Sequence, residues 1–369
     1  FVQDLAVAGH GRGRGRGLDL RVFASTRRPT PPLDNIVNLT PRTAIALPAY
    51  RTLDLAWPPA SLAQAARAWR PDAIHVSTPG PVGLAGRALA RRLGVPLVAT
   101  HHTDFPAFVA RLAPHGLRGE GARATRAYLR WFYRPARCVL ARSAASLTGL
   151  AGLGVAPGRV HVLRAGIDLS VFHPGPRDAA LRRRFHLKPD GKVALYAGRL
   201  SRDKDLDVLA RAWLAAHACL AARGTASVLL LAGEGPFRAG LARMLTPSAA
   251  RFLGPLARAD LAALYRSCDV LVTPSRTDTL GQCVMEALAS GLPAVVSDAG
   301  GPATLVRDGE TGVIVPSSGS WDEALAHLLL DDARRARLSA RAAEDARAWD
   351  FVHSLQDFWS VHEGVVARA

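Results

Sequence analysis

Two acidic residues lie close together in a chain with 30 acidic residues against 47 basic ones. Asp278 and Glu286 flank Gly281 in the stretch TDTLGQCVMEALASG, which follows the apolar run CDVLVTPS and precedes the apolar run LPAVVSD. In open α/β sheets a ligand binds beyond the carboxyl ends of the strands, which is where we expect this stretch to lie. Carboxylates at such a site can accept hydrogen bonds from ribose or other sugar hydroxyls.

The backbone between the two acids suits a phosphate group. We expect Thr279 to cap the following helix, so that the N–H groups of Leu280 and Gly281 face the ligand. Glycine at 281 would let a ligand approach the backbone closely. A phosphate between two hydroxylated rings describes a nucleotide diphosphate sugar. Spacing alone leaves a plainer alternative, in which Glu286 is an exposed helix residue and Asp278 a turn residue.

A second loop adds positive charge at the same predicted edge. The segment YAGRLSRDKDLD contains Gly198, Arg199 and Lys204, and only two other lysines, Lys188 and Lys192, occur in the chain. A pair of cations can stabilise the negative charge that grows on a leaving diphosphate. Surface charge at a helix start is the alternative interpretation. A glycine-rich turn at AGEGP, which contains Gly233, is expected at this edge too.

Strand-like and helix-like segments alternate along both halves of the chain, which predicts βαβ units with parallel sheets. The Pro- and Gly-containing segment 167–178 interrupts this alternation and is expected to link two domains. We therefore predict two Rossmann-like domains facing across a cleft, over 1–172 and 173–350. The remaining segment, 351–369, is predicted to be a helix that packs back on the first domain. The chain opens on a helix-like segment and the run GRGRGRG (11–17), and we expect that its first strand is missing.

Composition narrows the class of protein. The 369 residues carry a net charge of +17, and 49% of them are hydrophobic, enough for two cores. The opening residues have no secretory pattern, and the four cysteines have no metal-ligand spacing, which favours a cytoplasmic protein. The charge fits an anionic partner or a bias toward arginine. A nucleic-acid binder would explain the charge but not the motifs of the second half, and we expect no nucleic-acid partner.

Together these segments resemble family 4 retaining glycosyltransferases of the GT-B fold. The motifs GRLSRDKDLDVL, LAGEGP, VLRAGIDLSVFHP and the long segment from FLGPLARAD to GETGVIV match that family's pattern. In the first half, RPDAIHVSTPGPVGLAGRALARRLGVPLVATHHTDFPAFV is similar to the subgroup that glycosylates lipids, including mannosyltransferases. The resemblance covers nearly the whole chain, apart from the family's first strand and its Gly-rich loop.

The resemblance implies a role for each candidate residue. Residues of the second domain would bind the donor: Gly198, Arg199, Lys204, Gly233, Thr279, Leu280, Gly281 and Glu286. His102 and Asp278 would act as catalytic residues at the donor sugar, although the family usually has glutamate where this chain has Asp278. The family transfers the sugar with retention and needs neither a metal nor a cofactor. GDP-mannose is the donor favoured by resemblance, with a UDP-hexose as the second choice, and the acceptor would be a glycolipid or another envelope glycan.

A row of basic residues in the first domain suggests where the protein would contact a membrane that contains a lipid acceptor. Helical spacing places Arg123, Arg126, Arg130 and Arg134 on one face, with aromatic residues in the intervening positions. This pattern is typical of a helix at an anionic membrane surface, and equally of a solvated face on a packed helix. We expect a cytoplasmic protein, peripheral at the inner face of the membrane. Two alternatives remain open, a nucleotide-sugar-binding protein without activity and a sugar-nucleotide epimerase of the same architecture.

Overall fold

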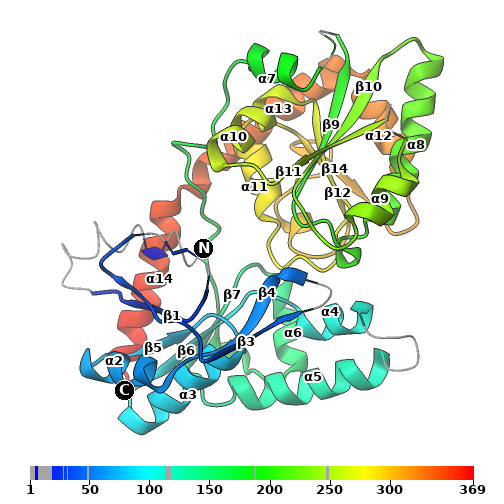
Figure 1. Ribbon diagram of the computed structural model, residues 1–369. Helices are drawn as coiled ribbons and strands as arrows, with labels where there is room; N and C mark the ends of the chain where they lie inside the picture. The colour runs from blue at the N-terminus through cyan, green and yellow to red at the C-terminus, as the bar shows by residue number, and fades with distance from the viewer. Residues whose placement is uncertain are drawn as a thin grey trace.

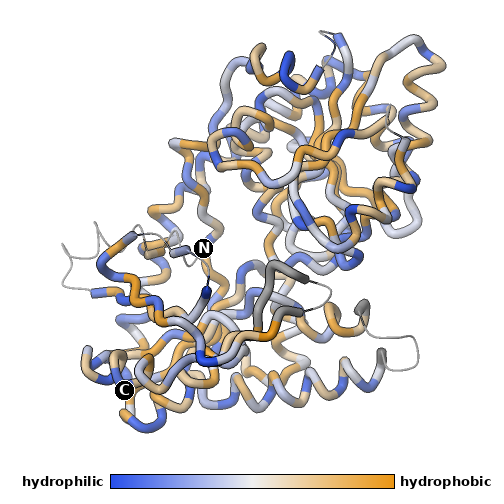
Figure 2. The backbone as a smooth tube through the Cα atoms, in the orientation of Figure 1, coloured by the Kyte–Doolittle hydropathy of each residue, from blue (hydrophilic) through white to orange (hydrophobic). Residues whose placement is uncertain are grey.

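The second half of the chain builds a six-stranded parallel sheet in the order β11-β10-β9-β12-β13-β14. This is a doubly wound order: β10 and β11 are added on one side of β9, and β12, β13 and β14 on its other side, so the switch point lies between β9 and β12. The strands are rich in Val, Leu and Ala because both faces of the sheet are covered. Figure 2 shows them as largely hydrophobic. Their bounds are β9 Lys192–Ala197, β10 Ser227–Ala232, β11 Ala250–Gly254, β12 Val270–Thr273, β13 Ala294–Ser297 and β14 Gly312–Val315.

Helices cover this sheet on both faces (Figure 1). One core includes residues of α8 Leu206–Ala222, α9 Arg238–Met244 and α12 Trp321–Leu330. The other includes residues of α7 Ala179–Arg184, α10 Arg258–Ser267, α11 Gln282–Ala289 and α13 Asp332–Ala346. Short 3₁₀ turns lie in the connections, at η3 Pro157–Arg159, η4 Arg202–Lys204, η5 Pro302–Thr304 and η6 Arg347–Trp349.

The computed structural model describes residues 5–6, 19–27, 29–30, 32–47, 50–112, 118–186, 188, 190–246 and 249–369. The GRGRGRG run therefore lies outside the described residues. The first half forms a four-stranded parallel sheet in the order β5-β6-β7-β8, with β5 Ile74–Val76, β6 Leu97–His101, β7 Cys138–Ala141 and β8 Val160–Val162. Two further pairs accompany it: parallel β1 Val22–Ala24 with β2 Ile36–Asn38, and antiparallel β3 Thr43–Leu47 with β4 Tyr50–Trp57.

Side chains alternate between the two faces of the four-stranded sheet, so its two cores are distinct. Val139 and Ala141 belong to a core shared with α3, α5 and α6. Val98 and Leu140 belong to the opposite core, which is completed by the C-terminal helix α14. The helices of this half are α2 Ala60–Ala68, α3 Pro81–Leu93, α4 Phe105–Leu112, α5 Arg118–Tyr133, α6 Ser146–Gly152 and α14 Phe351–Val366.

The chain crosses between the two domains twice, and the two crossings are hydrogen-bonded to each other. Ile167 N–H donates to the Trp349 carbonyl at 2.8 Å, and Phe351 N–H donates to the Ile167 carbonyl at 3.0 Å. After the second crossing, α14 runs from the C-terminal domain down to the N-terminal one (Figure 1). The junction between the domains thus consists of two adjacent segments, the predicted linker and the segment that leads into α14.

Candidate functional site

The candidate site lies at the switch point of the large sheet, where the loops after β9 and β12 meet. Gly198 follows β9, and Gly233 follows β10 with φ of 137°. A Cβ on Gly233 would lie 1.9 Å from the Gly198 carbonyl oxygen, so the two turns are in direct backbone contact. Only glycine at 233 allows this contact, which sets the height of the Arg199 loop above the sheet.

Four charged side chains form a network between the two loops. Arg199 Nη2 donates to Asp203 Oδ2 at 3.1 Å, and Lys204 Nζ lies 3.8 Å from the same oxygen. Lys204 Nζ also donates to Asp278 Oδ1, which joins the loop after β9 to the loop after β12. The site therefore brings together the two predicted cations with one of the predicted acids. Asp203, which is 2% exposed, holds both cations and was missed by the sequence analysis.

The loop at 278–281 is held by a second pair of glycines that the sequence analysis did not select. Gly301 N–H donates to the Asp278 carbonyl at 2.6 Å, and a Cβ on Gly301 would lie 2.4 Å from Leu280 Cα. The motif DAGG after β13 was the available signal, because paired glycines at a strand end indicate close backbone approach.

Helix α11 begins later than predicted. Its N-cap is Gly281, in the left-handed region with φ of 84°, so the prediction that Thr279 caps this helix is wrong. Glycine adopts this conformation without strain, and the helix therefore starts at Gln282. The Thr279 hydroxyl instead donates to the His102 carbonyl across the cleft at 2.6 Å.

Glu286 is buried, with 8% of its surface exposed, and is thus not a solvated helix residue. Tyr265 Oη donates to Glu286 Oε2 at 2.8 Å, and Gln282 Nε2 donates to Oε1 at 3.3 Å. These two donors fix the direction of the carboxylate oxygens. Burial raises the pKa of Tyr265 well above its usual value, so this hydroxyl keeps its proton and remains a donor.

His102 follows β6 and comes from the opposite domain. Burial, together with the positive charge of Arg142, lowers the pKa of His102 to about 3, so its imidazole is neutral at neutral pH. A neutral ring can donate from one nitrogen and accept at the other, as a sugar hydroxyl requires. His101 is 2% exposed and lies 3.4 Å from Tyr133 Oη, on the core side. Arg142, at 8% exposure beyond β7, is a further cation that the sequence analysis missed.

Contacts between the domains are concentrated around Thr279. Besides the bond to His102, the Ser143 hydroxyl donates to the Thr279 carbonyl at 2.5 Å. The Arg199 guanidinium lies 5.8 Å from the centre of the Phe108 ring on α4. A cavity of about 620 Å³ opens beside these contacts, lined from both domains by Ala107, Ala110, Arg202, Asp207, Arg276, Thr277 and Ala299.

The four arginines predicted at a membrane surface are exposed: Arg123, Arg126 and Arg130 on α5, and Arg134 directly after it. The aromatic flank expected beside them is largely wrong. Leu129, Phe132 and Tyr133 are at most 1% exposed, because they pack into the core under α5. Trp131 is the aromatic residue of this helix that is exposed, at 48%, and the Arg87 guanidinium lies 3.7 Å from the centre of its ring.

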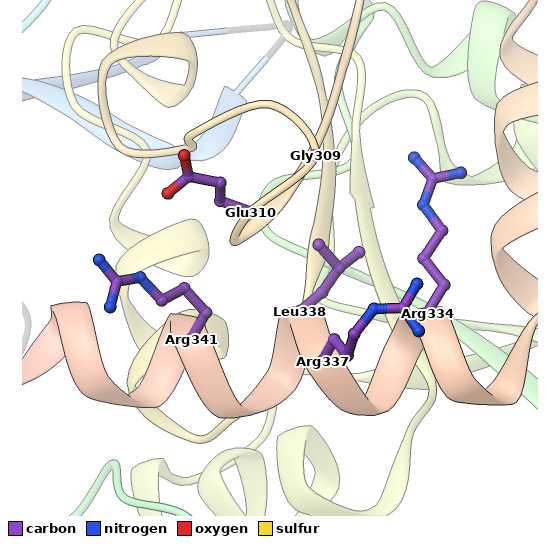
Figure 3. A pocket seen from close by; sticks show the side chains of 6 residues that line it. All are labelled: Gly309, Glu310, Arg334, Arg337, Leu338 and Arg341. Atoms are coloured by element: carbon purple, nitrogen blue, oxygen red, sulfur yellow. The ribbon is translucent and has the colours of Figure 1, made fainter.

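Another cavity, of about 390 Å³, lies between α13 and the turn before β14 (Figure 3). Arg334, Arg337 and Arg341 line it from the helix, with Glu310 opposite. None of the predicted site residues lines this cavity. Within the described part of the chain, no group of three or more His, Cys, Asp or Glu residues has the arrangement of a metal site. No helix in the same part is long and apolar enough to cross a membrane.

Both halves of the chain match models of known protein families. Residues 191–331 match "Glycosyl transferases group 1", and residues 11–171 match "Glycosyltransferase Family 4". A GDP-mannose-dependent alpha-mannosyltransferase of Mycobacterium tuberculosis is 37% identical over 310 residues, covering 83% of this chain and 76% of the relative. The corresponding protein of Mycolicibacterium smegmatis is 35% identical, covering 95% of this chain and 89% of the relative.

Solved structures share the fold. Sucrose-phosphate synthase from Thermosynechococcus elongatus superposes with a TM-score of 0.78 at 21% identity, covering all of this chain and 93% of the other. At that identity the likeness concerns the fold alone. The predicted fold class, two Rossmann-like domains in the GT-B arrangement, is confirmed.

Proposed function

The chain belongs to the family 4 glycosyltransferases of the GT-B fold, and from that premise we propose that it transfers mannose from GDP-mannose to an acceptor hydroxyl. That it is a glycosyltransferase follows from the family. The choice of donor rests on the two mannosyltransferase relatives, each more than a third identical over most of this chain. The observation that carries the mechanism is the network that joins Arg199 and Lys204 to Asp278, next to Thr279, whose hydroxyl donates to the His102 carbonyl.

Arg199 and Lys204 are the proposed ligands of the donor diphosphate. Asp203 holds both cations in place through its carboxylate, so little side-chain freedom would remain to be lost when the diphosphate binds. Their positive charge would stabilise the diphosphate as it leaves, without a metal ion. Gly198 and Gly233 support this loop through their backbone contact. The backbone at Thr279, Leu280 and Gly281 would contact the phosphate and sugar.

Glu286 would accept hydrogen bonds from the two ribose hydroxyls, in the direction that Tyr265 fixes. His102 and Asp278 would hold hydroxyls of the transferred sugar from opposite sides of the cleft. We propose that the reaction retains configuration at the sugar carbon. The bond from that carbon to the diphosphate oxygen breaks, and the acceptor oxygen forms its bond on the same face. A departing phosphate oxygen takes the acceptor proton.

The test offers labelled GDP-mannose, UDP-glucose and UDP-galactose to the protein with a crude lipid extract. We expect label from GDP-mannose to enter the organic phase. Glu286→Ala should lower kcat/KM for the donor by roughly 10²-fold, since a charged hydrogen-bonding partner contributes about 1.5–3 kcal/mol. Glu323→Ala, on the exposed face of α12, is the matched control and should leave transfer unchanged. Transfer from a UDP-hexose but not from GDP-mannose would overturn the assignment of the donor. Epimerisation of the donor sugar without transfer would overturn the assignment as a glycosyltransferase reaction.

A lipid acceptor is the second part of the proposal. The exposed arginines of α5, with Trp131 and Arg87 beside them, form a basic surface with one aromatic side chain. Such a surface suits the headgroup layer of an anionic membrane. We expect the protein to sediment with vesicles containing anionic lipid but not with neutral vesicles, and Arg126→Glu with Arg130→Glu to abolish that binding. Equal sedimentation with both kinds of vesicle would contradict the electrostatic role of α5.

A further inference from the structure

The C-terminal helix α14 joins the interdomain junction to the sheet that carries His102. Its first residue, Phe351, is hydrogen-bonded to Ile167 at the crossing. Its apolar face packs on Val98, Cys138 and Leu140 of the four-stranded sheet. Asp357, at the middle of the helix, accepts hydrogen bonds from His161 Nε2 at 3.0 Å and from Arg164 N–H at 2.9 Å. One turn beyond Asp357, the helix presents His362 to His75 on β5.

Four groups from three elements form a continuous chain of hydrogen bonds at this point. His362 Nδ1 lies 2.6 Å from the Phe358 carbonyl, His362 Nε2 lies 2.9 Å from His75 Nδ1, and His75 Nε2 lies 2.7 Å from Thr100 Oγ1. The rings of His75 and His362 are stacked, with centres 5.1 Å apart. Phe358 lies against both rings, at 5.3 Å from His75 and 4.1 Å from His362.

The Phe358 carbonyl fixes the direction of every hydrogen bond in this series. A carbonyl oxygen only accepts, so His362 Nδ1 carries the hydrogen. Neutral His362 then has a bare Nε2, which accepts from His75 Nδ1–H. Neutral His75 has a bare Nε2 in turn, which accepts from the Thr100 hydroxyl. Burial lowers the pKa of both His75 and His362, so both rings are neutral at neutral pH.

We propose that Thr100, His75 and His362 are positioning residues for His102, an assignment that rests on the proposed role of His102 at the donor sugar. Thr100 is 1% exposed and lies near the end of β6, two residues before His102, which directly follows the strand. The hydrogen-bond chain fixes that strand end to α14, whose other end is fixed at the interdomain junction. Small displacements of a group at a reacting centre have large effects on rate. This series of hydrogen bonds therefore couples the position of His102 to the junction between the domains.

Matched variants at Thr100 test this role. Thr100→Val keeps the shape and removes the hydroxyl, and Thr100→Ser keeps the hydroxyl. We expect the valine variant to lose about tenfold in kcat with donor KM changed less than twofold, and the serine variant to stay within twofold of the native protein. His362→Leu should behave like the valine variant. His362→Gln should restore most of kcat, because its side-chain oxygen can accept from His75 Nδ1–H. Equal losses in the two Thr100 variants, or unchanged kcat in Thr100→Val and His362→Leu, would overturn the proposal.

A measurement that needs no activity separates this inference from the proposed function. In the ¹⁵N spectrum of the histidine rings at pH 7.5, we expect His75 and His362 as Nδ1–H tautomers. The His102 ring signals should shift in Thr100→Val and stay in place in Thr100→Ser. Nε2–H tautomers of His75 and His362, or His102 signals that are unchanged by both substitutions, would overturn the inference even in an active enzyme. If no donor gives transfer while these signals behave as expected, the proposed function fails and the hydrogen-bond chain stands.

Discussion

At the scale of single residues, the site depends on groups that hold the ligand-binding side chains in place. Asp203 holds Arg199 and Lys204, Tyr265 holds Glu286, and Gly233 supports the loop of Arg199. Asp203 and Tyr265 are almost fully buried, and neither of them is proposed to touch the donor. They set the geometry on which binding depends.

Gly233 provides the sharpest residue-scale prediction. Gly233→Ala would place its Cβ 1.9 Å from the Gly198 carbonyl oxygen at a φ of 137°, so backbone must move. We expect a loss of several kcal/mol in the free energy of unfolding, because both overpacking and backbone strain contribute. Gly149→Ala is the control, since a Cβ at that exposed position in α6 meets nothing within 4 Å. That control should stabilise the protein by about 0.5–1 kcal/mol. Denaturant unfolding measures both, and equal midpoints for the two variants would contradict the packing argument.

At the scale of elements, α14 and β6 are joined by histidines that resist protonation. Burial lowers the pKa values of His75, His362 and His102, the last to about 3. Below the unfolded-state pKa of about 6.5, the unfolded chain binds protons that the folded protein excludes. Stability is therefore full above that pH and falls as the pH is lowered through it.

The expected result is a free energy of unfolding that falls by up to about 1.4 kcal/mol per histidine for each pH unit below about 6.5. Denaturant titrations at pH 7.5, 6.5 and 5.5 measure it. His362→Gln removes one of these groups and should reduce the slope by its share. A slope unchanged in that variant would mean that His362 is protonated in the folded protein.

At the scale of the whole molecule, Thr279 connects the two domains through two hydrogen bonds. Its hydroxyl donates to the His102 carbonyl and its carbonyl accepts from Ser143. A hydrogen bond contributes about 1 kcal/mol, which corresponds to roughly a fivefold change in the balance between open and closed forms. We expect Thr279→Val to increase the radius of gyration of the donor-free protein in solution scattering, and Thr279→Ser to leave it unchanged. Identical scattering from all three proteins would exclude a role for this bond in closure.

The sequence by itself determined the architecture and the main candidate residues. Alternating apolar segments predicted the parallel sheets, because a buried strand and an amphipathic helix have different hydrophobic periods. The loops that follow strands meet at one sheet edge, so Arg199, Lys204, Asp278 and Glu286 could be assigned together from their order in the chain. Local conformation was predicted less well: Gly281, not Thr279, caps α11, because glycine adopts a left-handed conformation that the motif alone does not reveal.

Only the tertiary structure decided which side chains meet. Lys204 pairs with Asp278 across 74 positions of sequence, Thr279 with His102 across 177, and His75 with His362 across 287. Phe132 and Tyr133 of α5 face the core because that helix covers the sheet, whereas Trp131 is exposed. Hydrophobic period reports which face of an element is buried, but not which distant group packs there. Those pairings depend on how the elements pack together and on the polar partners that buried groups then require.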